Sequence, residues 1–271
     1  GMLLLVSRLA LGTVGQVLRE TVEEPGLSIS EKQLTFNQSF LLVPNSNRPV
    51  DLTRIGLNYE EIGNFEQAQR AYEEALSVEP ASIVTAYLLA NLYSAQVIET
   101  DGASNEVALL ILDRALQGIR DVQSGRLNFE DLRLSRVEFV PQFEYLLLLT
   151  RAKLFLNMQE YAAADYDLIN AENIAHTDDA LFVRSDNKPA SDLVLPEDQP
   201  VPIRVTEMYY VRAQTCAHLF IETGAELNRR CAGEYWTRVL QLADARIGRE
   251  AIWNVHAAAA LNETDFALPI P

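Results

Sequence analysis

The sequence predicts an all-α protein in which about five antiparallel helical hairpins stack side by side as an α-solenoid. Two observations lead to this prediction: a helical hairpin pattern between Arg48 and Ala81, and the return of its spacing further along the chain. One such hairpin cannot bury its apolar face alone, so it implies neighbours on both sides. Because a solenoid core grows in one dimension, we expect residues 1–271 to form a single continuous domain.

The clearest hairpin occupies residues 48–81. Its first helix is expected to run to about Ile62 and its second from Phe65 to Val78, where Pro80 stops the hydrogen-bond ladder. Small residues stand where the two helices must approach closely, and aromatic residues fill the space beside them. These positions are Gly56, Ala68 and Ala75, with Tyr59, Phe65 and Tyr72.

The same spacing returns twice. Residues 82–118 repeat it with a longer elbow at 99–105, and residues 139–175 repeat it with helices over Phe143–Asn157 and Glu160–Ala175. Residues 121–138 break the period and are expected to form a connector with one extra helical turn. The repeated small or apolar positions are Ala86, Leu89, Ala90, Ala108, Leu112, Ala115, Ala152, Ala164, Leu168 and Ala171.

Both ends of the chain carry weaker versions of the pattern. Residues 2–44 are expected to form a degenerate first hairpin, since terminal repeats are commonly atypical. Near the other end, residues 206–261 predict a hairpin and a capping helix, followed by an irregular tail at 262–271. The predicted helices of this region are Thr206–Thr223, Ala225–Ile247 and Arg249–Leu261, with Tyr210, Ala213, Ala232 and Trp236 as packing residues.

The helical period disappears between Asp178 and Arg204, where four prolines forbid a continuous helix. At 27 residues this Pro-rich excursion is longer than the roughly 2–8 residues typical between packed helices. We expect Leu181–Ser185 and Ser191–Leu195 to pair as a small β-hairpin. The apolar residues of both segments are expected to be buried: Leu181, Phe182, Val183, Leu193, Val194 and Leu195. The excursion is expected to fold over a binding groove and restrict it.

The hairpin residues resemble the tetratricopeptide repeat, most clearly at 48–81, again at 82–118 and 143–175, and in degenerate form elsewhere. The resemblance implies a right-handed solenoid that serves as a platform for another protein, with an extended peptide or helix held in the concave groove. Carried over position by position, the groove residues are Thr53, Leu57, Glu61, Tyr87, Asn91, Leu149, Lys153 and Asn157. The family's clamp for terminal carboxylates uses Lys, Asn and Arg at such places, and Leu57 does not fit it.

Composition and charge limit the partners. The net charge is −16, with 38 acidic against 22 basic side chains, which disfavours nucleic acid because a phosphate-binding surface needs clustered Lys and Arg. The sequence contains no run of 18 apolar residues, so it predicts no membrane span. The apolar start at residues 2–17 is expected to be an amphipathic helix, or alternatively the remnant of an export signal or anchor. A cytoplasmic location is favoured, with a periplasmic or membrane-tethered one as the alternative; the oligomeric state stays open.

Cys216 and Cys231 are the only cysteines. They are placed nearly symmetrically about the expected turn at Gly224, so their sulfur atoms can face each other across the hairpin. A disulfide there would indicate an oxidising compartment. The alternative is two small buried thiols, since free cysteine is among the most buried residue types.

No pattern for catalysis or a cofactor is present. The sequence lacks a phosphate loop, a nucleophile elbow and a zinc-protease motif, and His218 with Glu222 offers too few ligands for zinc. The acidic pairs Glu60–Glu61 and Glu73–Glu74 are interpreted as solvated helix faces. We therefore expect a non-catalytic scaffold, or alternatively an exported or tethered protein that binds a partner or small molecule under residues 178–204.

Overall fold

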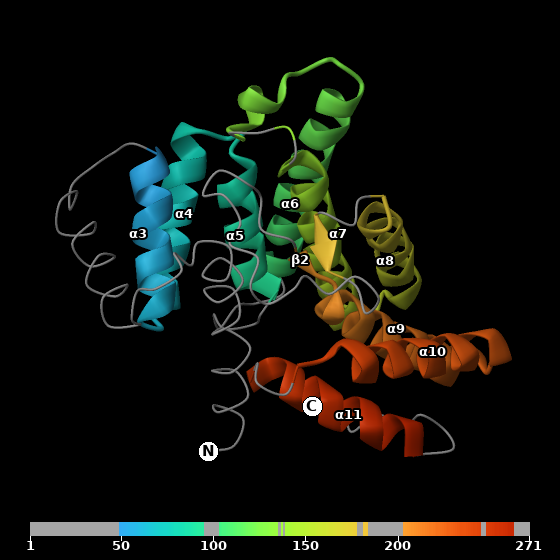
Figure 1. Cartoon of the computed structure of the whole chain (residues 1–271). Coiled ribbons are helices and arrows are strands. Elements are labelled where there is room, and N and C mark those ends of the chain that lie inside the picture. The colour runs from blue at the N-terminus through green and yellow to red at the C-terminus, as the bar shows by residue number, and fades with distance from the viewer. Residues whose placement is uncertain are drawn as a thin grey trace, which may run out of the picture. The chain divides into compact units, whose positions relative to one another are not determined.

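A computed structural model describes residues 49–94, 103–134, 137, 139–177, 181–183, 203–244 and 248–262. Most of these residues are helical, which confirms the all-α class (Figure 1). The predicted hairpin at 2–44, most of the excursion and the tail beyond Asn262 lie outside the described residues.

The described residues form helices, one 3₁₀ turn (η1) and a pair of short strands. In chain order the elements are α3 (Pro49–Glu61), α4 (Phe65–Val78), α5 (Ile83–Ser94), α6 (Ala103–Gln123), η1 (Phe129–Leu132), α7 (Phe139–Asn157), α8 (Tyr161–Ala175), β1 (Phe182–Val183), β2 (Ile203–Arg204), α9 (Thr206–Thr223), α10 (Glu226–Leu242) and α11 (Gly248–Asn262). The predicted helices at 65–78 and 206–223 match these bounds, and the final helix agrees within one residue.

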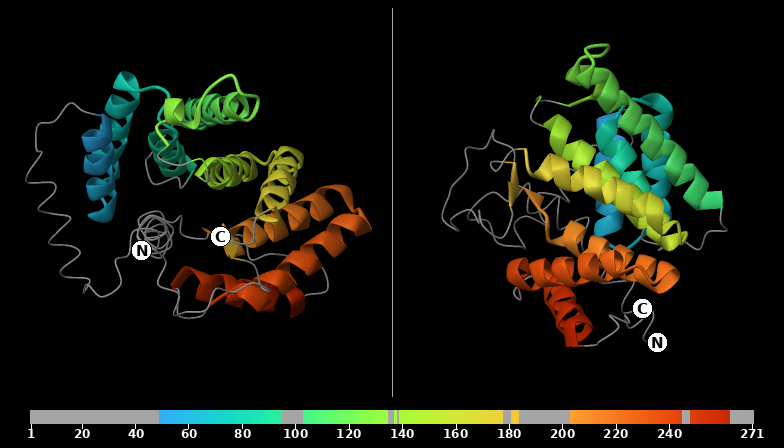
Figure 2. Two further views of the ribbon diagram at one scale, coloured as in Figure 1. Left: turned by 45° about the horizontal axis from the view of Figure 1, so that its top comes forward. Right: turned by 90° about the vertical axis from the view of Figure 1, so that its right-hand side faces the viewer.

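The chain divides into two compact units. The first unit contains residues 1–143 with 194–201, and the second contains residues 144–193 with 202–271. In the first unit α3 packs against α4, α4 against α5, and α5 against α6 (Figure 2). In the second unit α8 packs against α9, α9 against α10, and α10 against α11. The prediction of a single continuous domain stays a prediction.

The turn between α3 and α4 is built from local signals. Gly63 adopts a φ of +77°, a backbone conformation that costs glycine little. The N–H of Asn64 then donates to the carbonyl of Tyr59 at 2.8 Å, which satisfies one of the open carbonyls at the end of α3. The Asn64 side chain in turn accepts a hydrogen bond from the N–H of Gln67 and so caps α4.

Gly56 and Tyr72 define the contact between α3 and α4. Tyr72 is fully buried, and a Cβ placed on Gly56 would lie only 2.6 Å from Cδ1 and 2.8 Å from Cζ of its ring. The ring therefore lies directly on the backbone of α3. Ala68, on the same face of α4, is also fully buried. Small residues thus permit the close approach that the sequence predicted.

Replacing Gly56 with alanine is expected to destabilise the protein by about 1–2 kcal/mol. Overpacking against the buried ring costs about 1–3 kcal/mol, while alanine recovers up to about 1 kcal/mol of helix propensity. Urea unfolding at equilibrium measures the difference. In a double-mutant cycle, Gly56→Ala and Tyr72→Leu are expected to cost less together than the sum of their separate effects, because the second change removes the obstructing ring. Strict additivity would show that the ring is not the obstacle.

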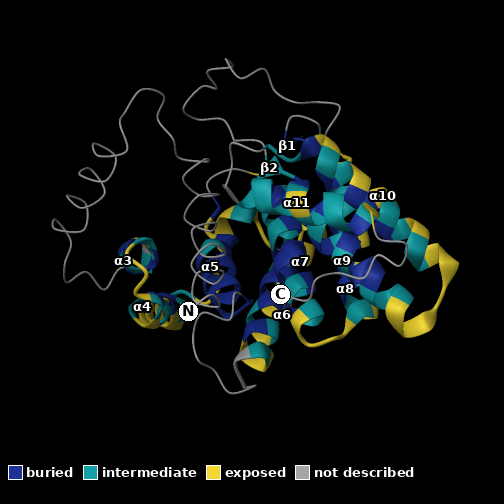
Figure 3. Ribbon diagram, turned by 90° about the horizontal axis from the view of Figure 1, so that it is seen from below, coloured by how far each residue is buried: buried dark blue, intermediate teal, exposed yellow. Residues whose placement is uncertain are grey.

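Helix α5 forms the centre of the first unit. Every residue of α5 except Val84 is buried, as the dark blue ribbon shows (Figure 3). A helix that is apolar nearly all round is typical of a fully enclosed position. Its polar Thr85 is satisfied by Ser82, whose hydroxyl lies 2.9 Å away, and by Thr53 on α3.

Two helix starts and the connector refine the predicted bounds. Helix α6 begins at Ala103 rather than after residue 105, because polar residues cost little in a first turn whose N–H groups lack helical partners. Helix α7 begins at Phe139 and not at Phe143, since Pro141 falls in the first turn and removes no helical hydrogen bond. Between them, η1 supplies the expected single turn.

The strand pairing differs from the predicted β-hairpin. Phe182–Val183 pairs with Ile203–Arg204, and the two strands run parallel. The predicted partner, Ser191–Leu195, lies outside the described residues. The expected burial of Leu181, Phe182 and Val183 is confirmed, with 8%, 0% and 4% of their surfaces exposed.

Helix α10 ends at Leu242, five residues before the predicted end at Ile247. Arg204 is the reason: its Nη2 donates to the carbonyl of Leu242 at 3.0 Å, so an open carbonyl at the helix end is satisfied. The same guanidinium holds Glu250 of α11 through two hydrogen bonds of 2.8 and 2.9 Å. Glu250 also accepts the N–H of Asp244 at 2.6 Å. The end of the excursion thereby fixes the turn between the last two helices.

Candidate functional site

The predicted groove residues of α3 lie on successive turns of that helix. Thr53 contacts α5, because its hydroxyl lies 2.8 Å from that of Thr85 and also donates to the carbonyl of Pro49 at 2.9 Å. Leu57 and Glu61, four and eight residues further on, are half-buried. Thr53 is half-buried as well, so all three side chains of the predicted row on α3 are partly accessible.

The predicted groove residues of α5 are buried. Only 5% of Tyr87 and 3% of Asn91 is exposed. The Tyr87 ring meets that of Phe143 edge to face, with 6.2 Å between ring centroids. In this structure both side chains contribute to packing inside the first unit, and a role in partner binding stays a prediction.

The predicted residues of α7 have three different environments in the second unit. Leu149 is buried, and Asn157 is exposed at the last position of the helix. The ammonium of Lys153 forms an ion pair with Glu207 of α9 at 2.9 Å. Burial opposes ionisation of Glu207, but the charges of Lys153 and Arg249 outweigh it and lower the pKa of the carboxyl. Lys153 thus has an internal counter-charge.

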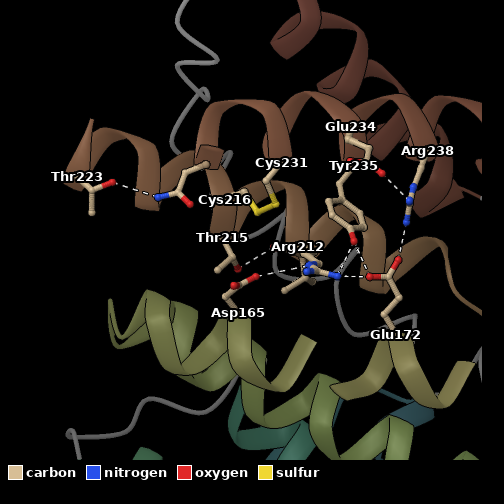
Figure 4. Close-up of a disulfide and its surroundings, with 12 residues drawn as sticks. Asp165, Glu172, Arg212, Thr215, Cys216, Thr223, Cys231, Glu234, Tyr235 and Arg238 are labelled. Carbon is tan, nitrogen blue, oxygen red and sulfur yellow. Dashed lines mark hydrogen bonds and ion pairs between the residues drawn. A yellow bond between two sulfur atoms is a disulfide. The ribbon is translucent and has the colours of Figure 1, made fainter. Parts of the chain in front are cut away.

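A disulfide joins α9 and α10. The Sγ atoms of Cys216 and Cys231 are 2.01 Å apart and their Cα atoms 5.8 Å apart, a separation that suits the bond (Figure 4). Gly224, in the turn between the two helices, has a φ of +66° and ends α9 in the left-handed conformation. The cross-link closes a short loop around this turn.

A polar cluster links α8, α9 and α10 beside the disulfide (Figure 4). Glu172 of α8 receives hydrogen bonds from Arg212 of α9 and, at 2.5 Å each, from Tyr235 and Arg238 of α10. The Tyr235 ring lies between the two guanidinium groups, 4.5 Å from Arg212 and 4.7 Å from Arg238. Burial and the bond to Glu172 raise the pKa of Tyr235, so its hydroxyl remains a donor. The Nε of Arg212 makes no hydrogen bond to the described residues and lies 3.5 Å from Oδ1 of Asp165, with which it forms an ion pair. The cluster fixes three helices to one another.

The interpretation of Glu60 as part of a solvated helix face was wrong. Glu60 is buried, with 6% of its surface exposed. The hydroxyl of Tyr72 donates to its Oε1 at 2.7 Å, while its Oε2 has no hydrogen-bond partner among the described residues. Burial raises the pKa of Glu60 to about 7, although the bond from Tyr72 acts in the opposite direction. The neighbouring acids Glu73 and Glu74 are exposed, as expected.

The Glu172 cluster was not predicted from the sequence. Its members come from three helices and are separated by up to 66 residues, so no local motif joins them. The one available signal was Arg212, which lies between the buried residues Val211 and Ala213 on α9. An arginine at such a position needs a buried counter-charge.

Two features are absent from the described part of the chain: a membrane-spanning helix and a group of metal ligands. None of its helices combines the length and apolar character that crossing a bilayer requires. Within the same residues, no three His, Cys, Asp or Glu side chains gather as a metal site would need. The His218 ring stacks on Tyr161 of α8, with centroids 4.8 Å apart, and its burial lowers the pKa of the imidazole.

Comparison with known proteins adds no family. No protein-family model, curated protein or solved structure matches the chain. Function must therefore be argued from the residues and the geometry described above.

Proposed function

We propose that the chain is a tetratricopeptide-like α-solenoid that binds an extended peptide or a helix of another protein in its concave groove. The observation that carries the proposal is a repeated turn. At Tyr59–Asn64 and again 96 residues later, at Phe155–Glu160, the last residue donates its N–H to the carbonyl of the first at 2.8 Å. In both turns the residue before the last has a positive φ, +77° for Gly63 and +63° for Gln159.

The side chains around these two turns support the same proposal. Positions that correspond after a shift of 96 residues are buried alike in α3–α4 and in α7–α8. Each of the following is fully buried: Ala68 and Ala164, Tyr72 and Leu168, Ala75 and Ala171, and Ala152, which corresponds to the buried Gly56. Recurring backbone and packing at fixed intervals are what a solenoid of equivalent hairpins requires.

Leu57 is the best position at which to test groove binding. It is half-buried on α3, so a peptide can contact it without unfolding the helix pair. A phage-displayed random peptide library would be selected on the immobilised full-length chain, and the affinities of selected peptides would be measured by fluorescence anisotropy. Leu57→Glu is expected to weaken the groove-binding peptides about tenfold or more, because it places a charge at an apolar anchor.

Leu227→Glu is the matched control. It makes the same chemical change at an exposed leucine of α10, where 76% of the surface is accessible. Circular dichroism would verify that both variants keep the helix content of the wild type. If both variants weaken the peptides equally, or if neither does, the groove on α3 is not the binding site.

The disulfide favours the extracytoplasmic alternative for the location. Disulfides persist in oxidising compartments such as the periplasm and are rare in the cytoplasm. We therefore propose that the scaffold works outside the cytoplasm. Trapping free thiols with a maleimide in intact cells tests this: unlabelled cysteines that become labelled only after reduction support the proposal, and direct labelling of Cys216 and Cys231 contradicts it.

A further inference from the structure

Helix α11 packs against α9 and α10 through a series of stacked side chains. On α11, Arg249, Trp253 and His256 share one face, because they are four and three residues apart. The Trp253 ring stacks on that of Tyr210 of α9, with 5.2 Å between centroids, and the Arg249 guanidinium lies 5.4 Å from the Trp253 centroid. The Tyr210 ring also meets Trp236 of α10 edge to face at 5.4 Å. Tyr210 therefore contacts both of the other helices.

One hydrogen bond of this contact depends on the protonation state of an imidazole. The Tyr210 hydroxyl lies 2.7 Å from Nδ1 of His256 and receives a hydrogen bond from Nε2 of Gln214 at 3.3 Å. Burial raises the pKa of Tyr210 to about 12, so the hydroxyl keeps its proton near neutral pH. Tyr210 can donate this proton to Nδ1 only when the imidazole is neutral and carries its own proton on Nε2.

The side chains next to His256 are uncharged. From α9 it faces Tyr210 and Gln214, and α10 contributes the Trp236 ring to the same contact. Burial lowers the pKa of His256, and no charge on the described residues contributes to this change.

The carboxylates of the neighbouring elements already have cationic partners. Glu207 of α9, one turn before Tyr210, is paired with Lys153 at 2.9 Å and with Arg249 at 3.8 Å. On α11 itself, Glu250 is paired with Arg204 of β2 at 2.8 Å. The charged residues of α10 are paired within that helix or with Glu172 of α8: Glu226, Arg229, Arg230, Glu234 and Arg238. A protonated His256 would therefore be a half-buried cation beside neutral groups.

We propose that the bond between Tyr210 and His256 is a pH-sensitive latch, which holds α11 against α9 while the imidazole is neutral and loosens when it is protonated. A proton on Nδ1 turns this acceptor into a donor, so the Tyr210 hydroxyl loses the partner to which it donates. Release of α11 would expose Ala257 and Ala260, which are fully buried in the closed form. The latch lies in the second unit and does not depend on the proposed peptide groove.

The direction of the pH effect follows from the burial of the imidazole. In the closed form the pKa of His256 lies below its ordinary value of 6.5, which the released helix recovers. Between these two values the open form binds more protons than the closed form. The contribution of the latch is therefore complete above pH 6.5 and is lost as the pH falls through the lowered pKa.

Hydrogen exchange of the full-length protein, followed by mass spectrometry, measures whether α11 opens. Peptides from residues 248–262 would be compared at about pH 7.5 and about pH 5, after correction for the intrinsic effect of pH on exchange. Acid is expected to lower their protection by at least about threefold in the wild type. Circular dichroism would verify that the helix content of every protein studied is retained at both pH values.

Two variants test the chemistry of the latch. In His256→Asn the side-chain oxygen takes the place of Nδ1 as an acceptor and cannot be protonated. This variant is expected to remove the dependence of α11 protection on pH. Tyr210→Phe removes the donor and is expected to give, at about pH 7.5, protection as low as that of the wild type in acid.

His218→Asn is the matched control, since it replaces another half-buried imidazole of the second unit, one that stacks on Tyr161 of α8. It is expected to keep the full pH effect on α11. Protection of α11 that does not change with pH in the wild type would overturn the latch. So would a pH effect in His256→Asn as large as that of the wild type, or an equal loss of the effect in His218→Asn.

Discussion

Replacing Glu60 with glutamine is expected to stabilise the protein at pH 8 by up to about 3 kcal/mol, and to change its stability at pH 4 little. The carboxyl has a pKa of about 7 in the folded protein against 4.5 in the unfolded chain. Between these values the folded state binds more protons, so stability falls as pH rises, and the loss is complete above pH 7. At about 1.4 kcal/mol per pH unit, this difference sets the limit of about 3 kcal/mol.

Urea unfolding at a series of pH values between 4 and 8 measures this effect. Glutamine cannot ionise, and its side-chain oxygen can still accept the hydrogen bond of Tyr72. The matched control is Glu74→Gln, which removes an exposed carboxyl from the same hairpin. A stability difference between wild type and Glu60→Gln that stays constant with pH would show that Glu60 is not buried as described.

Removing the disulfide by Cys216→Ala with Cys231→Ala is expected to cost about 3 kcal/mol, the loss predicted when a cross-link across about 15 residues no longer restricts the unfolded chain. The sequence separation of the two cysteines is 15 residues. The denaturation midpoint in urea, followed by far-UV circular dichroism, measures the difference. Because the bond ties α9 to α10, unfolding of the second unit is expected to shift more than that of the first.

Reduced wild-type protein provides the control for this prediction. A reductant is expected to lower the wild-type midpoint to that of the double variant and to leave the variant unchanged. Equal midpoints for oxidised and reduced wild type would mean that the cross-link contributes nothing to stability.

Local signals allowed much of the helical pattern to be predicted. The bounds of α4 follow from Asn64, which caps its start, and from Pro80, which follows its end. Gly224 likewise marks the end of α9. Each of these residues acts within one turn of its own position, so it can be recognised without knowledge of the neighbouring helices.

The remaining features depend on contacts between distant segments. The burial of Glu60 is set by the elements that surround α3 and not by its own helix. Its charge therefore wrongly suggests an exposed position. The end of α10 is set by Arg204, 38 residues earlier in the chain. The strand pair has only two residues on each side, too few to show a period in the sequence. The groove residues implied by the tetratricopeptide resemblance are divided between two units. The peptide experiment tests the part of the groove that lies on α3.

The parallel pair β1–β2 limits how the chain between its two strands can be shortened. The chain leaves β1 at Val183 and enters β2 at Ile203, and Phe182 lies opposite Ile203 in the register. Paired strands are about 4.8 Å apart, so the points of departure and return are neighbours. Because the strands run parallel, the connection must cross from the end of β1 back to the start of β2, which takes about a dozen residues or more. A two-residue turn, which joins antiparallel strands, would therefore break the β1–β2 pair if it replaced residues 184–202.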